Sequence, residues 1–130
     1  MAAVALVVDD SMVIRHTICQ FLEDRGFAVE SASNGLEALE ILNRVVPALV
    51  ITDMQMPAMG GSELITAIKK EPSTARVPIV IVTGRSSGYD SREKRAEFTI
   101  FKDIDIQEQL EKALDTLAPS CRTKSQASGE

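Results

Sequence analysis

The sequence has 130 residues, a length suited to one domain with a single hydrophobic core. Its 45% apolar and 25% charged residues are typical of a soluble globular protein rather than a disordered one. The net charge of −5 argues against binding to a nucleic-acid backbone, which requires clustered lysine and arginine. No apolar stretch reaches the roughly 18 residues that span a bilayer, and the N-terminus lacks the basic start of a secretory signal. We therefore expect a cytoplasmic protein without membrane contact.

Five short apolar runs read as β-strands, and amphipathic stretches lie between them. In chain order the predicted strands are residues 4–8, 27–31, 48–52, 77–82 and a fifth that ends before Lys102. The second carries Glu30 and Ser31, which favours a position at the edge of the sheet. Apolar strands that alternate with helices indicate a parallel sheet with both faces covered.

The predicted helices start at side chains that cap helix N-termini. The first begins near Met12 after Ser11 and ends at Gly26, where a left-handed backbone is expected. A second helix is expected after Asn34, with Leu39, Leu42 and Val46 on one side and Pro47 as its stop. A third follows Gly60-Gly61-Ser62, has Leu64, Ile65 and Ile68 on its inward side and ends near Pro72. The last is opened by Asp105, with Glu108 as its capping-box partner.

Residues 85–97, between the fourth and fifth strands, form the weakest of the five helical segments. The stretch is highly charged, is interrupted by Ser86-Ser87-Gly88 and has no apolar stripe, so we expect a short or degenerate helix there. The predicted fold is thus a three-layer, doubly wound α/β domain with a parallel five-stranded sheet. It spans residues 1–118, and the polar residues 119–130 are expected to form a disordered tail.

Polar residues gather where the predicted strands end. They are Asp9 and Asp10 after the first strand, Asp53 after the third, Thr83 after the fourth and Lys102 after the fifth. Ligands of open parallel sheets bind outside the carboxyl ends of the strands, so these five residues are the candidate site.

Three carboxylates in close proximity repel one another unless a cation lies among them. Mg²⁺, which takes one or two carboxylates and keeps several waters, suits such an open rim. A carboxylate oxygen of Asp53 could then attack phosphorus, because aspartyl phosphates are an established covalent intermediate. Lys102 would neutralise the transferred group and Thr83 would donate a hydrogen bond to it. Positioning and charge neutralisation supply most of the catalysis in phosphoryl transfer.

Each of these residues also has a plain structural interpretation. An Asp at a strand end is more often a helix cap or turn former than a nucleophile. The role of Asp10 could likewise be limited to capping the first helix. A Thr that ends a strand and a solvated Lys are ordinary features. The functional interpretation depends on the convergence of all five residues at one edge.

Several motifs resemble those of response-regulator receiver domains over residues 4 to 118. The stretch from Asp53 to Gly61, DMQMPAMGG, is similar to the phosphorylation-site loop D-x-x-M-P-x-M-x-G. The segments VVDDS at 7–11, NGLEAL at 34–39 and VIVTG at 80–84 resemble the first acidic strand end, the start of the second helix and the fourth strand of that family. The resemblance implies the flavodoxin-like strand order 2-1-3-4-5.

The resemblance also implies roles for individual residues. Asp53 would be phosphorylated by a histidine kinase or a histidine phosphotransfer protein, and the domain would assist its own phosphorylation and dephosphorylation. Asp10, Asp53 and the backbone carbonyl of Gln55 would hold Mg²⁺, while Asp9 would bind it through water. Thr83 would swing toward the phosphoryl group and Lys102 would pair with it, which would bias a two-state surface toward an unidentified protein target.

Three departures from the family pattern fall between the fourth strand and the last helix. Lys102 is followed by Asp103, where the family usually has proline in a cis peptide. Thr99 stands where the family usually has a switch aromatic, although Phe98 and Phe101 flank it. The segment between Thr83 and Lys102 is also shorter than usual. Phosphate acceptance is expected to be intact, whereas the usual output switch is in question.

Other functions remain open at this point. The chain could be a stand-alone receiver, a receiver excised from a larger regulator or hybrid kinase, or a degenerate receiver that acts only as a binding module. A flavin-binding module is disfavoured because Asp9 and Asp10 would repel its phosphate. A dinucleotide oxidoreductase would need G-x-G-x-x-G, and a haloacid-dehalogenase-type phosphatase would need D-x-D where this chain has Asp53-Met54-Gln55.

Overall fold

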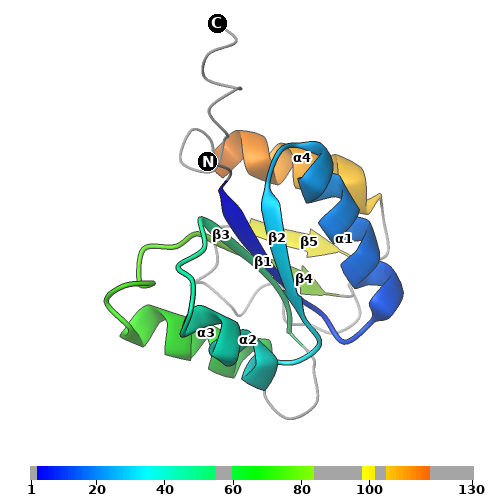
Figure 1. Cartoon of the computed structure of the whole chain (residues 1–130). Helices are drawn as coiled ribbons and strands as arrows, with labels where there is room; N and C mark the ends of the chain where they lie inside the picture. Colours follow the sequence, from blue (N-terminus) through cyan, green and yellow to red (C-terminus); the bar gives the residue numbers. More distant parts are fainter. Residues whose placement is uncertain (1–2, 55–59, 84–97, 102–104, 118–130) are drawn as a thin grey trace, which may run out of the picture.

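The computed structural model of the chain describes residues 3–54, 60–83, 98–101 and 105–117. These residues form a three-layer α/β sandwich (Figure 1) with five strands and four helices. The strands are β1 (Val4–Val8), β2 (Ala28–Ala32), β3 (Leu49–Asp53), β4 (Ile79–Thr83) and β5 (Phe98–Phe101). The helices are α1 (Met12–Asp24), α2 (Gly35–Leu42), α3 (Gly61–Lys70) and α4 (Ile106–Leu117). The predicted fold class is confirmed.

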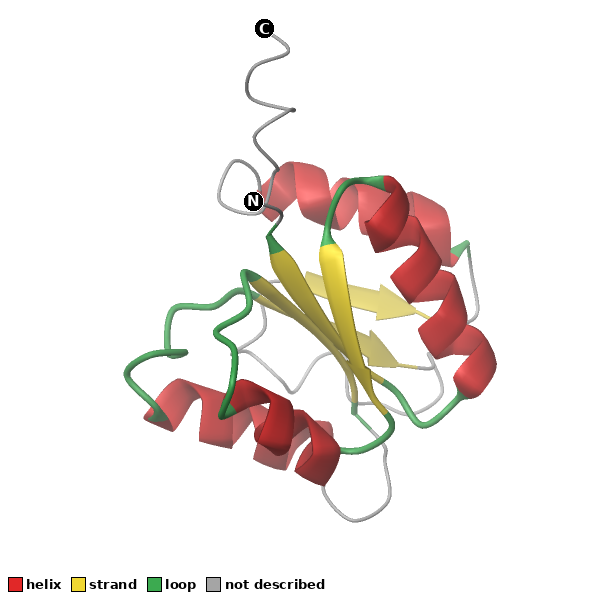
Figure 2. Cartoon of the chain, in the orientation of Figure 1, coloured by secondary structure: helices red, strands yellow, loops and turns green. Residues whose placement is uncertain are grey.

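The five strands form one parallel sheet in the order β2-β1-β3-β4-β5. This order, which the family resemblance implied, places β1 and β3 side by side in the interior and makes β2 and β5 the two edges (Figure 2). The edge position expected for β2 is therefore confirmed. Because all the strands are parallel, their carboxyl ends lie along one edge of the sheet, where the polar residues of the sequence are found.

Two hydrophobic cores lie on opposite faces of the sheet. In Figure 1, α1 and α4 cover one face, while α2 and α3 cover the other. Successive side chains of β1 pack alternately into the two cores. Val7 packs beneath α1 and α4, whereas Leu6 and Val8 pack toward α2 and α3. A fully buried aliphatic side chain stabilises the fold by about 1.5–3 kcal/mol. This packing on both faces explains why the inner strands are continuously apolar.

The helix ends follow the predicted capping chemistry. Ser11 and Asn34 accept hydrogen bonds at their side-chain oxygens from the backbone N–H groups of Ile14 and Glu37, at 3.4 and 2.9 Å. Gly26 has a φ of 93°, in the left-handed region where a side chain would be strained. These caps set the direction in which α1 and α2 leave the strands.

The second helix differs from its prediction. It ends at Leu42 instead of continuing to Pro47, and Val46 is exposed. Ala38 and Ile41 provide its buried face, while Leu39 is only partly buried. Because α2 has only about two turns, the narrow stripe that meets the sheet consists of residues three positions apart, namely Gly35, Ala38 and Ile41. The bounds of β2 and β4 also shift by one or two residues toward the C-terminus.

Two predicted segments lie outside the described residues: the degenerate helix at 85–97 and the tail at 119–130. Within the described part of the chain, no helix combines the length and apolar character needed to span a membrane.

Candidate functional site

Three carboxylates meet at the carboxyl edge of the sheet. Asp9 and Asp10 follow β1, and Asp53 is the last residue of the neighbouring strand β3. One carboxylate oxygen from each residue lies within 4.8 Å of the others. Asp9 and Asp53 are buried, at 1% and 3% exposure, whereas Asp10 is exposed. The structure thus brings together the three acidic residues that the sequence singled out.

Backbone and side-chain hydrogen bonds hold Asp9 in place. Its Oδ1 accepts a hydrogen bond from the backbone N–H of Ser11 at 2.8 Å, and its own N–H donates to the carbonyl of Ala32 at 3.1 Å. The guanidinium of Arg15, one turn into α1, donates to the Asp9 carbonyl at 2.7 Å. Sequence analysis did not single out Arg15, because an arginine near the start of an amphipathic helix has no distinctive pattern. These contacts make the turn after β1 a fixed support for Asp9 and Asp10.

The backbone around Asp53 is fixed by a close approach of α3. The N–H of Gly61 donates to the carbonyl of Met54 at 3.1 Å. A Cβ atom at position 61 would lie 2.4 Å from the carbonyl oxygen of Asp53, so only glycine fits there. The hydroxyl of Thr52 donates to the same carbonyl of Asp53 at 3.0 Å. The end of β3 is therefore held from both sides.

Thr83 lies on the neighbouring strand at the same edge. Asp53 stands opposite Val82 in the β3–β4 register, so Thr83 is one residue beyond it, and Thr83 in turn stands opposite Phe101 of β5. Thr83 is only 2% exposed. Lys102 and Gln55, the other two predicted site residues, lie outside the described residues, although Lys102 directly follows Phe101 in the chain.

The donor set of the acidic cluster fits a hard divalent cation. Mutually close carboxylates disfavour one another's ionised form unless positive charge lies between them. Three carboxylate oxygens within 4.8 Å offer only oxygen ligands, the type that Mg²⁺ prefers, and the exposed Asp10 leaves the cluster open to water on one side. These residues therefore fit Mg²⁺ with part of its hydration retained.

An acidic residue with a shifted pKa, Glu37, lies in the first turn of α2, which follows the carboxyl end of β2. The backbone N–H and the hydroxyl of Ser33 donate to Glu37 at 2.8 and 3.0 Å. These hydrogen bonds, with a smaller contribution from the charge of Arg15, hold the pKa of Glu37 below its ordinary value. The two hydrogen bonds to Glu37 fix the turn that follows β2.

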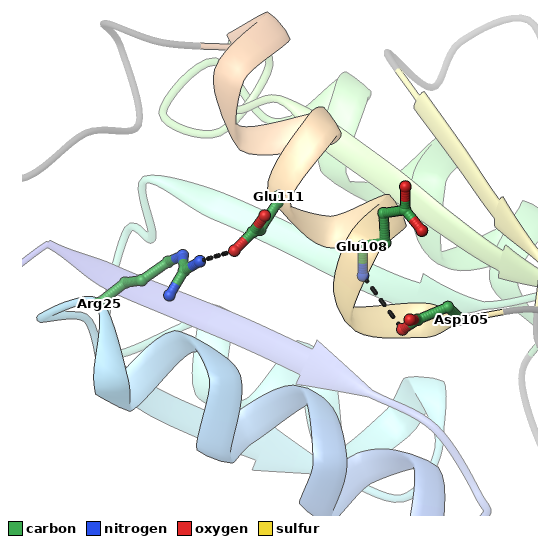
Figure 3. A network of polar contacts seen from close by, with 4 residues as sticks. All are labelled: Arg25, Asp105, Glu108 and Glu111. Atoms are coloured by element: carbon green, nitrogen blue, oxygen red, sulfur yellow. Dashed lines mark hydrogen bonds and ion pairs between the residues drawn. The ribbon is translucent and has the colours of Figure 1, made fainter.

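Helix α4 is anchored at two points (Figure 3). At its start, Asp105 accepts a hydrogen bond from the N–H of Glu108 at 3.2 Å, which confirms Asp105 as the cap. The Glu108 carboxylate lies 3.8 Å from the ammonium of Lys112, and the two form an ion pair one turn apart on α4. The return bond of a capping box from Glu108 stays a prediction. In its middle, Glu111 forms an ion pair with Arg25, at the end of α1.

Residues 5–115 match the response regulator receiver domain family. The chain belongs to this family, as the motif resemblance predicted, and it is homologous to two-component response regulators. Within the described residues, the carboxyl-edge acids and the 2-1-3-4-5 sheet agree with that assignment.

Three relatives illustrate the likeness. The response regulator Rre1 of Synechocystis is 37% identical over 81 residues, which cover 62% of this chain and 35% of Rre1. The chemotaxis response regulator CheY4 of Vibrio cholerae superposes with a TM-score of 0.79 at 30% identity, covering 89% of this chain and 98% of CheY4. The receiver domain of the Pseudomonas aeruginosa sensor histidine kinase PA1611 is similar in fold, with a TM-score of 0.78 at 20% identity. The match covers 89% of this chain and 97% of that domain, which holds a magnesium ion in its active-site cleft.

Several of the curated relatives are longer than this chain. The chain covers 41% of the probable transcriptional regulator ycf29 of Pyropia yezoensis and 35% of Rre1. The likeness thus concerns the receiver portion of those proteins.

Proposed function

We propose that this domain accepts a phosphoryl group on Asp53 from a phosphohistidine of a histidine kinase or histidine phosphotransfer protein. The observation that carries the proposal is the meeting of Asp9, Asp10 and Asp53 within 4.8 Å at the carboxyl edge of a receiver fold. Asp53 is the acceptor because it ends the interior strand β3 and its backbone is held by Thr52 and Gly61. A nucleophile that is fixed before the reaction loses little entropy when phosphorus arrives.

The transfer is a single displacement at phosphorus. A carboxylate oxygen of Asp53 donates an electron pair to phosphorus, and the bond from phosphorus to the histidine nitrogen breaks. The imidazole nitrogen keeps the electron pair of that bond, and a proton replaces the phosphoryl group on the ring. No general base is needed, because positioning and charge neutralisation supply most of the catalysis in phosphoryl transfer.

The metal belongs to the same proposal. Asp10, Asp53 and the backbone carbonyl of Gln55 would hold Mg²⁺, with Asp9 bound through water. When bound, the ion supplies positive charge that offsets the three carboxylates and the phosphoryl oxygens. The magnesium in the PA1611 receiver supports this assignment by analogy of fold.

Thr83 and Lys102 complete the proposed site. Thr83 lies on the strand next to Asp53, one residue farther along in register, where its hydroxyl can donate to a phosphoryl oxygen. Lys102 follows β5 directly and would pair with the transferred group. We assign the receiver to residues 1–118 and its output to protein–protein contacts with a target that is still to be found.

The test uses a small phosphodonor. In the presence of Mg²⁺ and acetyl phosphate, where acetate leaves with the electron pair of the broken P–O bond, the chain should gain the mass of one phosphoryl group. The adduct should survive acid and be lost in base. Asp53→Asn should abolish the gain, whereas Asp24→Asn, which changes an exposed carboxylate in the last turn of α1, should retain it. Undiminished phosphorylation of the Asp53→Asn variant would sink the proposal.

A further inference from the structure

Gln109, in the second turn of α4, makes an unusual set of hydrogen bonds. Its side-chain Oε1 accepts from the backbone N–H of Phe101 at 2.9 Å, and its Nε2 donates to the Phe101 carbonyl at 2.8 Å. The same Nε2 lies 3.2 Å from the carbonyl of Asp105, to which it also donates. One side chain thus bonds to the last residue of β5 and to the cap of α4.

The paired bonds to Phe101 act like those of a neighbouring strand. Among the described strands β5 is an edge of the sheet, so no other described strand pairs with the backbone on its outer side. A primary amide carries the same donor and acceptor as a peptide group, and Gln109 presents both to one residue. Its side chain is partly buried, which limits competition from water. Phe101 is consequently fixed on its outer side by Gln109 and stands in register with Thr83 on its inner side.

Phe101 and Asp105 bracket the three residues Lys102-Asp103-Ile104. This short connection contains no proline to restrict its backbone. Gln109 holds both ends with one rigid planar group. The register with Thr83 further ties the start of the connection to the strand next to Asp53.

We propose that Gln109 is a positioning residue for phosphoryl transfer, which acts by fixing the chain on either side of Lys102. The inference rests on the proposed function, since it assumes that Lys102 meets the phosphoryl group on Asp53. Gln109 does not touch the reacting atoms. It restricts where the Lys102 ammonium can reach, and a small misplacement of such a group lowers the rate strongly.

A purely structural role makes a different prediction. If Gln109 only protects the sheet edge or docks α4, its loss lowers stability without any selective effect on the reaction. If it positions Lys102, its loss slows phosphorylation while Mg²⁺ affinity is unchanged, because the carboxylates proposed to hold the metal lie at the ends of β1 and β3. The two roles are therefore separated by comparing the rate constant with the metal affinity.

The first experiment replaces Gln109 with Met, which keeps the length of the side chain and removes its hydrogen bonds. Phosphorylation by acetyl phosphate is followed at saturating Mg²⁺, and the Kd for Mg²⁺ is measured by calorimetry. We expect the rate constant to fall about tenfold, with the Kd unchanged within a factor of about two. Gln107→Met is the matched control, because Gln107 is exposed on the same helix, and it should behave as the wild type. Gln109→Ala serves as a second variant should the Met variant fail to fold.

The second experiment places Gln109→Met in a Lys102→Ala background. If Gln109 acts through Lys102, the double variant should be no slower than Lys102→Ala alone. A Gln109→Met protein with the wild-type rate would overturn the inference, as would an equal loss of rate in the two backgrounds. Failure of the wild type to gain a phosphoryl group would instead contradict the proposed function itself, so the two failures are distinct.

Discussion

The two halves of the carboxyl edge are built in different ways. On the β1–β3 side, the strands themselves deliver the functional groups: Asp53 is the last residue of β3, and Asp9 follows β1 directly. Both are buried, and hydrogen bonds that involve their own backbone or side-chain atoms hold them. On the β4–β5 side, Thr83 ends β4, the side chain of Gln109 on α4 holds Phe101 at the end of the edge strand β5, and Asp105 caps the start of α4. One half is fixed by the sheet and the other by a helix.

This difference predicts which step of the reaction a substitution on each side should affect. The half built by interior strands should tolerate few substitutions, and those substitutions should change metal binding and the ability of Asp53 to accept a phosphoryl group. The half tied to α4 should tolerate more change and should control the rate of transfer. Substitutions at the two sides should therefore separate metal affinity from transfer rate.

The largest expected effect is on metal binding. Asp10→Asn removes one of the carboxylates proposed to hold Mg²⁺ and should weaken its binding by at least about a hundredfold, since even changes in groups that only support ligands cost about 10–100-fold. Calorimetric titration with Mg²⁺ measures the effect. Asp24→Asn is the control for the loss of one negative charge, and an equal weakening there would show that net charge, rather than ligation, is responsible.

The second effect concerns the support of Asp53. Gly61→Ala places a Cβ atom 2.4 Å from the Asp53 carbonyl and should lower the free energy of unfolding by about 1–3 kcal/mol, because the backbone must shift. Gly60→Ala is the matched control, since its Cβ would lie 3.3 Å from the Met54 carbonyl. Urea unfolding measures both. If the two variants lose equal stability, the close approach at position 61 is not the constraint that we describe.

The third effect tests the α4 side. Asp105→Ala removes the cap and should cost about 1 kcal/mol of unfolding free energy, with slower phosphorylation and unchanged Mg²⁺ affinity. Asp105→Asn should restore both stability and rate, because its side-chain oxygen can accept the same hydrogen bond from Glu108. A change in Mg²⁺ affinity in the Ala variant would break the separation between the two halves.

The smallest effect is expected at the other anchor of α4. Arg25 pairs with Glu111 and lies 4.1 Å from the centroid of the Phe21 ring, but its side chain is 37% exposed and that of Glu111 57%. Exposed ion pairs contribute about 0–1 kcal/mol, so Arg25→Ala should lower stability by no more than about 1 kcal/mol and leave phosphorylation unchanged. Thermal unfolding at low and high salt, together with a phosphorylation time course, checks both statements.

Sequence reasoning predicted the sheet and the acidic cluster well, for a physical reason. Continuous apolar runs identify buried parallel strands, and an Asp directly after such a run can lie only at the carboxyl edge. Helix packing was harder to predict: Val46 was assigned to α2 because it is apolar, yet the helix ends at Leu42. Arg15 and Gln109 were missed because their roles depend on hydrogen bonds to backbone groups four to eight residues away, which no residue pattern reveals. Lys102 and Gln55 remain predictions.

The most direct test of the account locates the phosphoryl group itself. The wild-type chain is phosphorylated with acetyl phosphate and Mg²⁺, the acyl phosphate is reduced with borohydride, and the digested protein is sequenced by mass spectrometry. Reduction converts a phosphorylated aspartate to homoserine, so the account predicts homoserine at position 53 and unchanged aspartate at positions 9 and 10. Homoserine at either of those positions, with Asp53 intact, would contradict the central claim.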